Sequence, residues 1–180
     1  MISADQLGLL KKLFPFFSDP DSDLTREMMN VGQLHSFVPG QIIFTEGDQC
    51  TALALVVEGE IRVYKQGESG REITLYRLES GESCILTASC ILNEESFPAL
   101  AVVEKPSTAL IIPSGYIRSW MSRYPAWRDF VFRLISRRLG NIISVVEEVT
   151  FRRMDQRLAE YLLHNFTHQG KALSRTHQDI

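Results

Sequence analysis

The stretch from Ser36 to Ile112 most strongly limits what this chain can fold into. Short apolar runs alternate there with turn residues about every ten positions, a spacing typical of antiparallel rolls and barrels. A polar loop at residues 66–71 separates two of these runs, and its glycines suit the positive backbone angles of a hairpin. We therefore predict an antiparallel roll over this stretch.

Helical patterns flank the predicted roll on both sides. A turn-rich break follows the first helix, and Ser22 or Asp23 is expected to cap the second. Prolines open the two helices that follow the roll. The four predicted helices cover residues 2–17, 24–31, 113–120 and 125–154.

The last of these helices carries an apolar stripe with spacings of three, four, three, four and three residues. This is the pattern of a coiled-coil seam, which buries one helix against a second copy of itself. Val131 and Leu134 form a second apolar edge that could serve contacts within the chain. We therefore predict a homodimer seam, the alternative being that the stripe packs on the chain's own core. The seam consists of Phe132, Ile135, Leu139, Ile142, Val146 and Val149.

Length, charge and cysteine content narrow the class of protein. A chain of 180 residues can bury one core with an appendage but not two large domains. No apolar run approaches the ~20 residues of a membrane span, and the N-terminus lacks a signal segment, so we expect a cytoplasmic protein without a membrane partner. The net charge of -3 gives the whole chain no electrostatic footprint of nucleic-acid binding. The odd set of Cys50, Cys84 and Cys90 predicts no disulfide framework.

The order of runs and glycines resembles the cyclic-nucleotide-binding β-roll. Residues 39–48 resemble its opening strands, residues 56–63 match its second recurrent segment, and Gly81-Glu82 falls where the roll turns into its ligand-binding cassette. Residues 133–139 and the seam after them look like the dimer helix of the bacterial catabolite-activator and fumarate-nitrate-reduction (Crp/Fnr) regulators. The resemblance implies a double-stranded, jelly-roll-like β-roll, a long dimerisation helix and the start of a winged helix-turn-helix.

The resemblance also implies four regions and a role in transcription. The run Thr176 to Ile180 resembles the first lines of the winged helix-turn-helix, and the recognition helix that would enter the major groove is absent from this sequence. The chain is therefore expected to dimerise within a regulator that binds DNA, with RNA polymerase as a further partner, but not to read DNA by itself. The implied regions are N-terminal helices (1–35), a β-roll sensor (36–112), the short and dimer helices (113–154) and an incomplete helix-turn-helix (155–180).

The sequence lacks the residues that form the phosphate pocket in this family. Backbone N–H groups and an arginine neutralise a cyclic phosphate in such a pocket, and a glutamate holds the ribose. The Gly-Glu pair of the family falls on Ile85 and Leu86, and its Arg-Ser pair falls on Phe97 and Pro98. No arginine lies between positions 77 and 118.

The dimer helix departs from the family as well. Its two positions that usually offer hydroxyls to the purine hold Ile142 and Ile143. We therefore predict that the protein does not bind a cyclic nucleotide, and that Ile142 serves both the partner helix and an altered pocket. The predicted pocket residues are Cys84, Ile85, Leu86, Thr87, Cys90, Phe97, Ile142 and Ile143.

Three other effectors can be weighed against these residues. A thiol switch could use Cys84 and Cys90. Such a switch needs a cation or a helix N-terminus near the cysteine to make the thiol reactive. The alternative is that both cysteines are small, buried, apolar residues. An apolar ligand or a haem could fill the pocket, and haem would need an axial ligand, for which only His35 belongs to the sensor half. An iron–sulfur cluster is not expected, because three thiols cannot complete a four-thiolate set.

Metal and catalytic sites find no support in the sequence. His164 and His168 lie four residues apart, but no Cys or carboxylate completes a metal set, so a solvated helix face is expected. The nucleophile elbow, the P-loop and the zinc-protease motif are missing, so we expect no enzyme. The rival readings are a regulatory β-roll of a signalling enzyme or channel, a thiol-responsive regulator, or a stand-alone protein that dimerises with and blocks a full-length regulator.

Overall fold

The computed structural model describes the backbone of residues 4–151 and the side chains of residues 6–144. The chain divides into two compact units, Met1–Ile135 and Ser136–Ile180. The predicted helix-turn-helix start, at residues 155–180, lies outside the described residues. The same holds for His164 and His168, and for the side chains of Val146 and Val149.

The N-terminal region forms α1 (Ala4–Leu13), the 3-10 turn η1 (Pro15–Phe17) and α2 (Asp23–Val31). The prediction of one helix over residues 2–17 is wrong, because α1 ends before Pro15. A proline restricts the residue before it to extended angles and lacks an N–H for a helix bond. Phe14 is accordingly extended, with φ −126° and ψ 113°.

Helix α2 begins as its sequence predicts. Ser22 is the N-cap, and its Oγ accepts a hydrogen bond from the Thr25 N–H at 3.2 Å. The cap satisfies one of the N–H groups that the first turn of a helix leaves without a partner.

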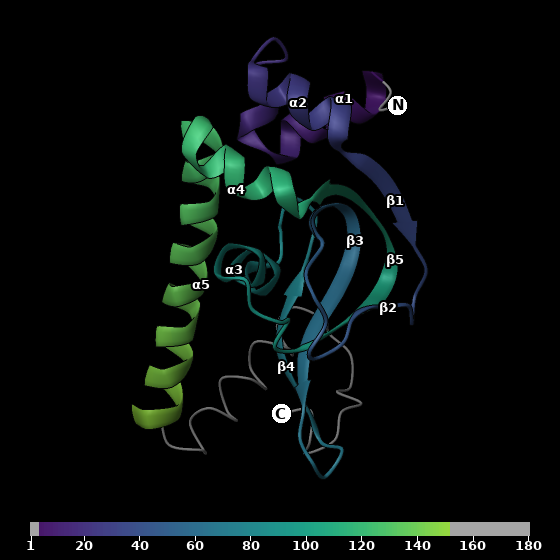
Figure 1. Cartoon of the computed structure of the whole chain (residues 1–180). Coiled ribbons are helices and arrows are strands. Elements are labelled where there is room, and N and C mark those ends of the chain that lie inside the picture. Colours follow the sequence, from purple (N-terminus) through teal and green to yellow (C-terminus); the bar gives the residue numbers. More distant parts are fainter. Residues whose placement is uncertain (1–3, 152–180) are drawn as a thin grey trace, which may run out of the picture. The chain divides into compact units, whose positions relative to one another are not determined.

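The described residues form one antiparallel sheet of five strands, in the order β1-β5-β3-β4. Strand β5 is central, because β3 pairs along one of its edges while β1 and β2 pair with it elsewhere (Figure 1). This arrangement confirms the predicted antiparallel roll followed by a long helix. The strands are β1 (Gln33–Phe37), β2 (Ile42–Phe44), β3 (Ala52–Gln66), β4 (Glu72–Leu78) and β5 (Leu100–Pro113).

Strand β3 runs through residues 58–60 without interruption. Strand β3 shifts register against β5 three times around Gly59, which has a φ of +96°. Such irregularities bend a strand without ending it. The glycine therefore marks a bend in β3.

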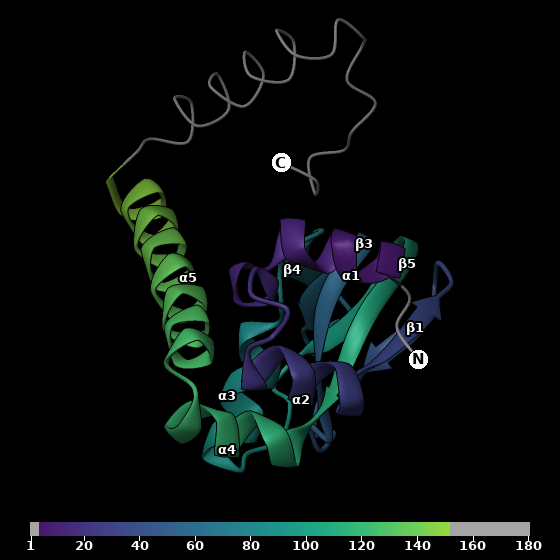
Figure 2. The same ribbon diagram turned by 90° about the horizontal axis from the view of Figure 1, so that it is seen from above.

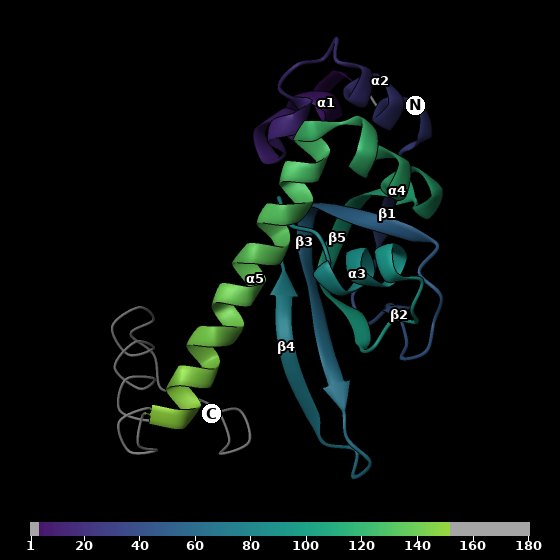
Figure 3. The same cartoon turned by 60° about the vertical axis from the view of Figure 1, so that its left-hand side comes forward.

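Three helices complete the described part of the chain: α3 (Ile85–Asn93), α4 (Ser114–Arg123) and α5 (Pro125–Phe151). Helices α1, α2 and α4 gather at one end of the strands (Figures 1 and 2). The β3–β4 hairpin projects at the opposite end (Figure 3). Helix α3 contacts both β3 and α4. Helix α5 begins at Pro125, as predicted.

An aromatic cluster joins the N-terminal helices to the start of α5. Phe16 packs edge-on against both Trp127 and Phe130, with ring centroids 5.6 and 5.0 Å apart. Trp120 of α4 packs against Trp127 at 5.6 Å, and both indoles are fully buried. This cluster fixes the first turns of α5 on η1 and α4. Within the described residues, no helix is both long and apolar enough to cross a bilayer.

Candidate functional site

The cassette is the segment that enters and includes α3, and it is pinned to β3 at its entry. The Ser83 Oγ donates to the Ala54 carbonyl oxygen at 2.8 Å. The Gly81 N–H donates to the Val56 carbonyl oxygen, and the Val56 N–H donates to the Glu82 carbonyl oxygen, both at 2.9 Å. Ser83 is fully buried. The entry turn is therefore held in place by bonds to the neighbouring strand.

A thiol caps the first turn of α3. The Cys84 Sγ accepts a hydrogen bond from the Thr87 N–H and lies next to the Tyr76 hydroxyl, at 3.4 Å in each case. In a helix N-terminus that binds an anion, the ligand would accept bonds from these N–H groups. Here the chain's own sulfur accepts from Thr87.

The side chains of α3 carry no charge that could pair with an anion. Its nine residues, ILTASCILN, include no charged residue. Ile85 and Leu86 are half-buried, and Thr87 is buried. Phe97 is also buried and packs against Phe44 in a tilted arrangement, with ring centroids 4.9 Å apart, so it belongs to the core.

The cations nearest to the cassette in the sequence are bound to carboxylates or carbonyls. Arg77 donates a hydrogen bond to Glu104 at 2.7 Å. This bond raises the pKa of Arg77, although partial burial of the guanidinium acts in the opposite direction. Lys105 pairs with Glu60 at 2.8 Å. Arg118 of α4 binds the C-terminal end of α3, as described below. None of these side chains supplies the charge that a phosphate would need.

Comparison with known proteins identifies the fold and the family. The cyclic nucleotide-binding domain family matches residues 34–124 of this chain. The cAMP-activated, CRP-like global transcriptional regulator of Mycobacterium tuberculosis is 25% identical over 158 residues, covering 86% of this chain and 68% of that protein. A crystal structure from Eubacterium rectale, described as a Crp/Fnr-family transcriptional regulator, is similar with a TM-score of 0.76. It is 28% identical, and the match covers 93% of this chain and 78% of that one. The chain belongs to the Crp/Fnr family.

Other relatives agree with this placement. The global nitrogen regulator of Synechococcus elongatus is 25% identical over 133 residues, which is 73% of this chain and 59% of that protein. The Crp/Fnr proteins that this chain resembles are regulators and not enzymes.

The cysteines of this Crp/Fnr chain differ from the prediction. Cys50 and Cys90 form a disulfide, and Cys84 is a free, buried thiol. The two cysteines of the thiol-switch hypothesis, Cys84 and Cys90, are therefore not bonded to each other. Cys84 instead accepts a hydrogen bond from the Thr87 N–H, while Cys90 lies six positions further along the chain and is bonded to the loop before β3.

Helix α5 has two apolar edges, as predicted. Val131 is buried and Leu134 packs against the core, so this edge serves contacts within the chain. The stripe residues with described side chains are exposed: Phe132 by 56%, Ile135 by 39%, Leu139 by 57% and Ile142 by 60%. Ile143 is 50% exposed. The roles of Ile142 and Ile143 in the pocket remain predictions.

A carboxylate that the sequence analysis missed joins α2 to α4. Glu27 accepts hydrogen bonds from the Trp120 Nε1 at 2.6 Å and from the Tyr124 hydroxyl at 2.8 Å, and it pairs with Arg123 at 2.5 Å. These donors, Trp120 foremost, lower the pKa of Glu27. No local pattern points to Glu27, because its partners lie more than ninety positions away.

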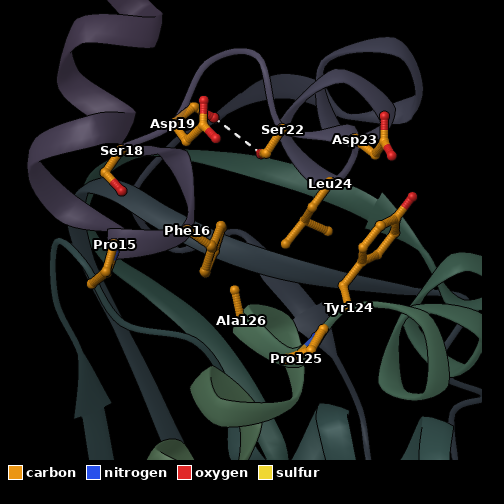
Figure 4. Close-up of a pocket in the computed structure, with 10 residues that line it drawn as sticks. All are labelled: Pro15, Phe16, Ser18, Asp19, Ser22, Asp23, Leu24, Tyr124, Pro125 and Ala126. Atoms are coloured by element: carbon orange, nitrogen blue, oxygen red, sulfur yellow. Dashed lines mark hydrogen bonds between the residues drawn. The ribbon is translucent and has the colours of Figure 1, made fainter.

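A cavity of about 350 Å³ opens beside this cluster, away from the cassette (Figure 4). Figure 4 shows Phe16, Leu24 and Tyr124 at its wall, with Asp19 and Ser22 at one side. None of the predicted pocket residues lines it. His35 is exposed on β1, and the described residues contain no cluster that could hold a metal.

Proposed function

We propose that this chain is the sensor and dimerisation module of a DNA-binding Crp/Fnr regulator whose effector is not a cyclic nucleotide. The observation that carries the proposal is the charge-free cassette helix, whose first turn is capped by the chain's own Cys84. A cyclic phosphate would lose its hydration there without gaining a charge-assisted hydrogen bond.

The dimer part of the proposal rests on α5. The buried edge at Val131 already fixes the helix on its own core, so the exposed stripe is free for a second copy of the chain. An isoleucine side chain buried in a seam contributes about 1.5–3 kcal/mol. Each position occurs twice in a symmetric dimer, so one stripe residue controls about 3–6 kcal/mol.

The partners of the whole regulator follow from the family. We propose that the winged helix-turn-helix begun at residues 155–180 carries DNA binding, and that RNA polymerase is a further partner. A thiol-responsive regulator is the second candidate, because Cys50 and Cys90 are close enough to form a disulfide.

Calorimetric titration with cAMP and with cGMP tests the effector part. We expect no saturable heat up to millimolar nucleotide, with the cAMP-activated relative from Mycobacterium tuberculosis as the positive control. Saturable binding in the micromolar range would overturn this part of the proposal.

Light scattering tests the dimer part through two matched variants of α5. Ile142→Asp places a charge on the stripe, whereas Ser144→Asp places the same charge on the opposite, exposed face. We expect Ile142→Asp to raise the dimer dissociation constant by about a hundredfold or more, with little change for Ser144→Asp. A monomeric wild-type protein would refute the seam.

A further inference from the structure

Two cysteines from distant parts of the sequence meet beside the cassette. Cys50 lies in the loop before β3, and Cys90 lies on the buried side of α3. Their disulfide spans 40 positions of the sequence, with the Cα atoms 6.1 Å apart. The bond therefore ties the loop between β2 and β3 to the cassette helix.

Other contacts join the same loop to residues 96–97, which follow α3. The Phe97 N–H donates to the Asp48 carbonyl oxygen at 2.8 Å, and the Gly47 N–H donates to the Phe97 carbonyl oxygen at 2.9 Å. Gln49 forms a β-bridge with Ser96, and its Nε2 donates to the Ser96 hydroxyl at 3.2 Å. These bonds do not depend on the sulfur atoms. They keep the two cysteines close after reduction, so the disulfide can form again.

The surroundings suit both redox states. The Cys90 Sγ lies 2.9 Å from the Glu95 carbonyl oxygen, so a reduced thiol has a hydrogen-bond acceptor in place. Cys50 is 9% exposed and Cys90 is 4% exposed. A small oxidant therefore reaches Cys50 first.

We propose that Cys50 and Cys90 form a reversible redox pair that tethers the cassette helix when oxidised and releases it when reduced. The inference rests on the proposed function, because a DNA-binding regulator works where thiols are kept reduced. Disulfides in that compartment are usually transient, catalytic or sensing rather than structural.

The oxidant that we assign is a low-molecular-weight disulfide. The Cys50 thiolate attacks one sulfur of this disulfide and forms a mixed disulfide, while the other half leaves as a thiolate. The Cys90 thiolate then attacks the Cys50 sulfur, and the second half leaves. The protein loses two protons and two electrons, and the small disulfide is reduced to two thiols. The same steps in reverse open the pair.

Helix α4 is the element that the tether reaches next. The Ile91 carbonyl oxygen, adjacent to Cys90, accepts two hydrogen bonds from Arg118 of α4, at 2.8 and 2.6 Å. Arg118 also forms an ion pair with Glu94, just beyond α3. Helix α4 ends at Arg123, and the extended residue Tyr124 alone separates it from α5. Opening or closing the Cys50–Cys90 disulfide therefore affects α4, the helix that precedes the proposed dimer seam.

Hydrogen exchange on the full chain tests the tether. The protein is equilibrated with reduced glutathione or with glutathione disulfide, and the pairing is read by differential alkylation and mass spectrometry. We expect glutathione disulfide to join Cys50 to Cys90, and reduction to speed amide exchange in α3 by about tenfold or more. Exchange in the central strands β3 and β5 should not change.

Two variants sharpen the result. Cys50→Ser should show fast α3 exchange in both glutathione mixtures, whereas Cys84→Ser should keep the wild-type response. Unchanged α3 exchange on reduction, failure of glutathione disulfide to oxidise the pair, or a bond from Cys84 to Cys90 would each overturn the proposal. Nucleotide titration and light scattering do not depend on these thiols, so they test the proposed function separately.

Discussion

The substitution Gly59→Ala probes the bend in β3, on which the shape of the roll depends. Gly59 has a φ of +96°, an angle that L-residues rarely adopt. An added Cβ would lie 2.5 Å from the Cα of Ser107 on β5, and closer still to the Pro106 carbonyl oxygen and the Ser107 hydroxyl. Backbone atoms of a central strand cannot move aside as the end of a flexible side chain can. The methyl group must therefore push the two strands apart.

The cost of Gly59→Ala has two parts. A left-handed backbone angle costs an L-residue about 1–2 kcal/mol. Overpacking against a fixed neighbour costs about 1–3 kcal/mol. We therefore expect the free energy of unfolding to fall by about 2–5 kcal/mol, a large share of the ~5–15 kcal/mol that keeps a domain folded.

Urea denaturation followed by tryptophan fluorescence measures this loss, since the indoles of Trp120 and Trp127 are both buried. The matched control is Gly70→Ala in the β3–β4 hairpin, where φ is +80° but nothing lies near the added Cβ. Only the backbone part applies there, so the two losses should differ by about 1–3 kcal/mol. Equal losses would refute the close approach of β3 and β5. Adding Ser107→Ala should not rescue Gly59→Ala, because the backbone contacts remain.

Two further predictions concern the N-terminal helices. The lowered pKa of Glu27 means that its bonds to α4 stabilise the fold at pH above the ordinary value of 4.5 and are lost as the pH falls below it. An acid titration followed by tryptophan fluorescence should show a transition as these bonds are lost, in the wild type and in Glu46→Gln but not in Glu27→Gln. The same transition in Glu27→Gln would contradict the prediction. Ser22→Ala should lower the free energy of unfolding by about 1 kcal/mol through loss of the α2 cap, whereas Ser69→Ala in the exposed hairpin loop should be neutral; urea denaturation compares the two.

Local signals in the sequence were enough for most of the fold. The Ser22 cap, the hairpin at residues 66–71 and the start of α5 at Pro125 depend on residues within a few positions of one another. The two edges of α5 follow from the helical period alone. Phe14 shows the limit of this reasoning, because the effect of Pro15 on its angles ended a helix whose apolar period continues.

Contacts between distant positions were not predictable in this way. The Cys50–Cys90 bond joins residues 40 positions apart, and nothing in their spacing distinguishes it from a bond between Cys84 and Cys90. The continuity of β3 through Gly59 depends on its pairing with β5. The Glu27 cluster depends on three partners from α4 and its end. Each feature is set by how the strands and helices pack, which the sequence of one segment does not specify.

The cassette also limits how any effector can act on this regulator. An effector shifts the balance between two arrangements only by the difference in its free energy of interaction with each. A charge-free helix capped by Cys84 offers an anion little that could differ between two arrangements. Under the proposed function, the difference comes from apolar burial beside Ile85 and Leu86, or from making and breaking a covalent bond at Cys90. Arg118 of α4 binds the Ile91 carbonyl oxygen, next to Cys90. A covalent change at Cys90 therefore acts close to α4, which precedes the helix of the proposed dimer seam.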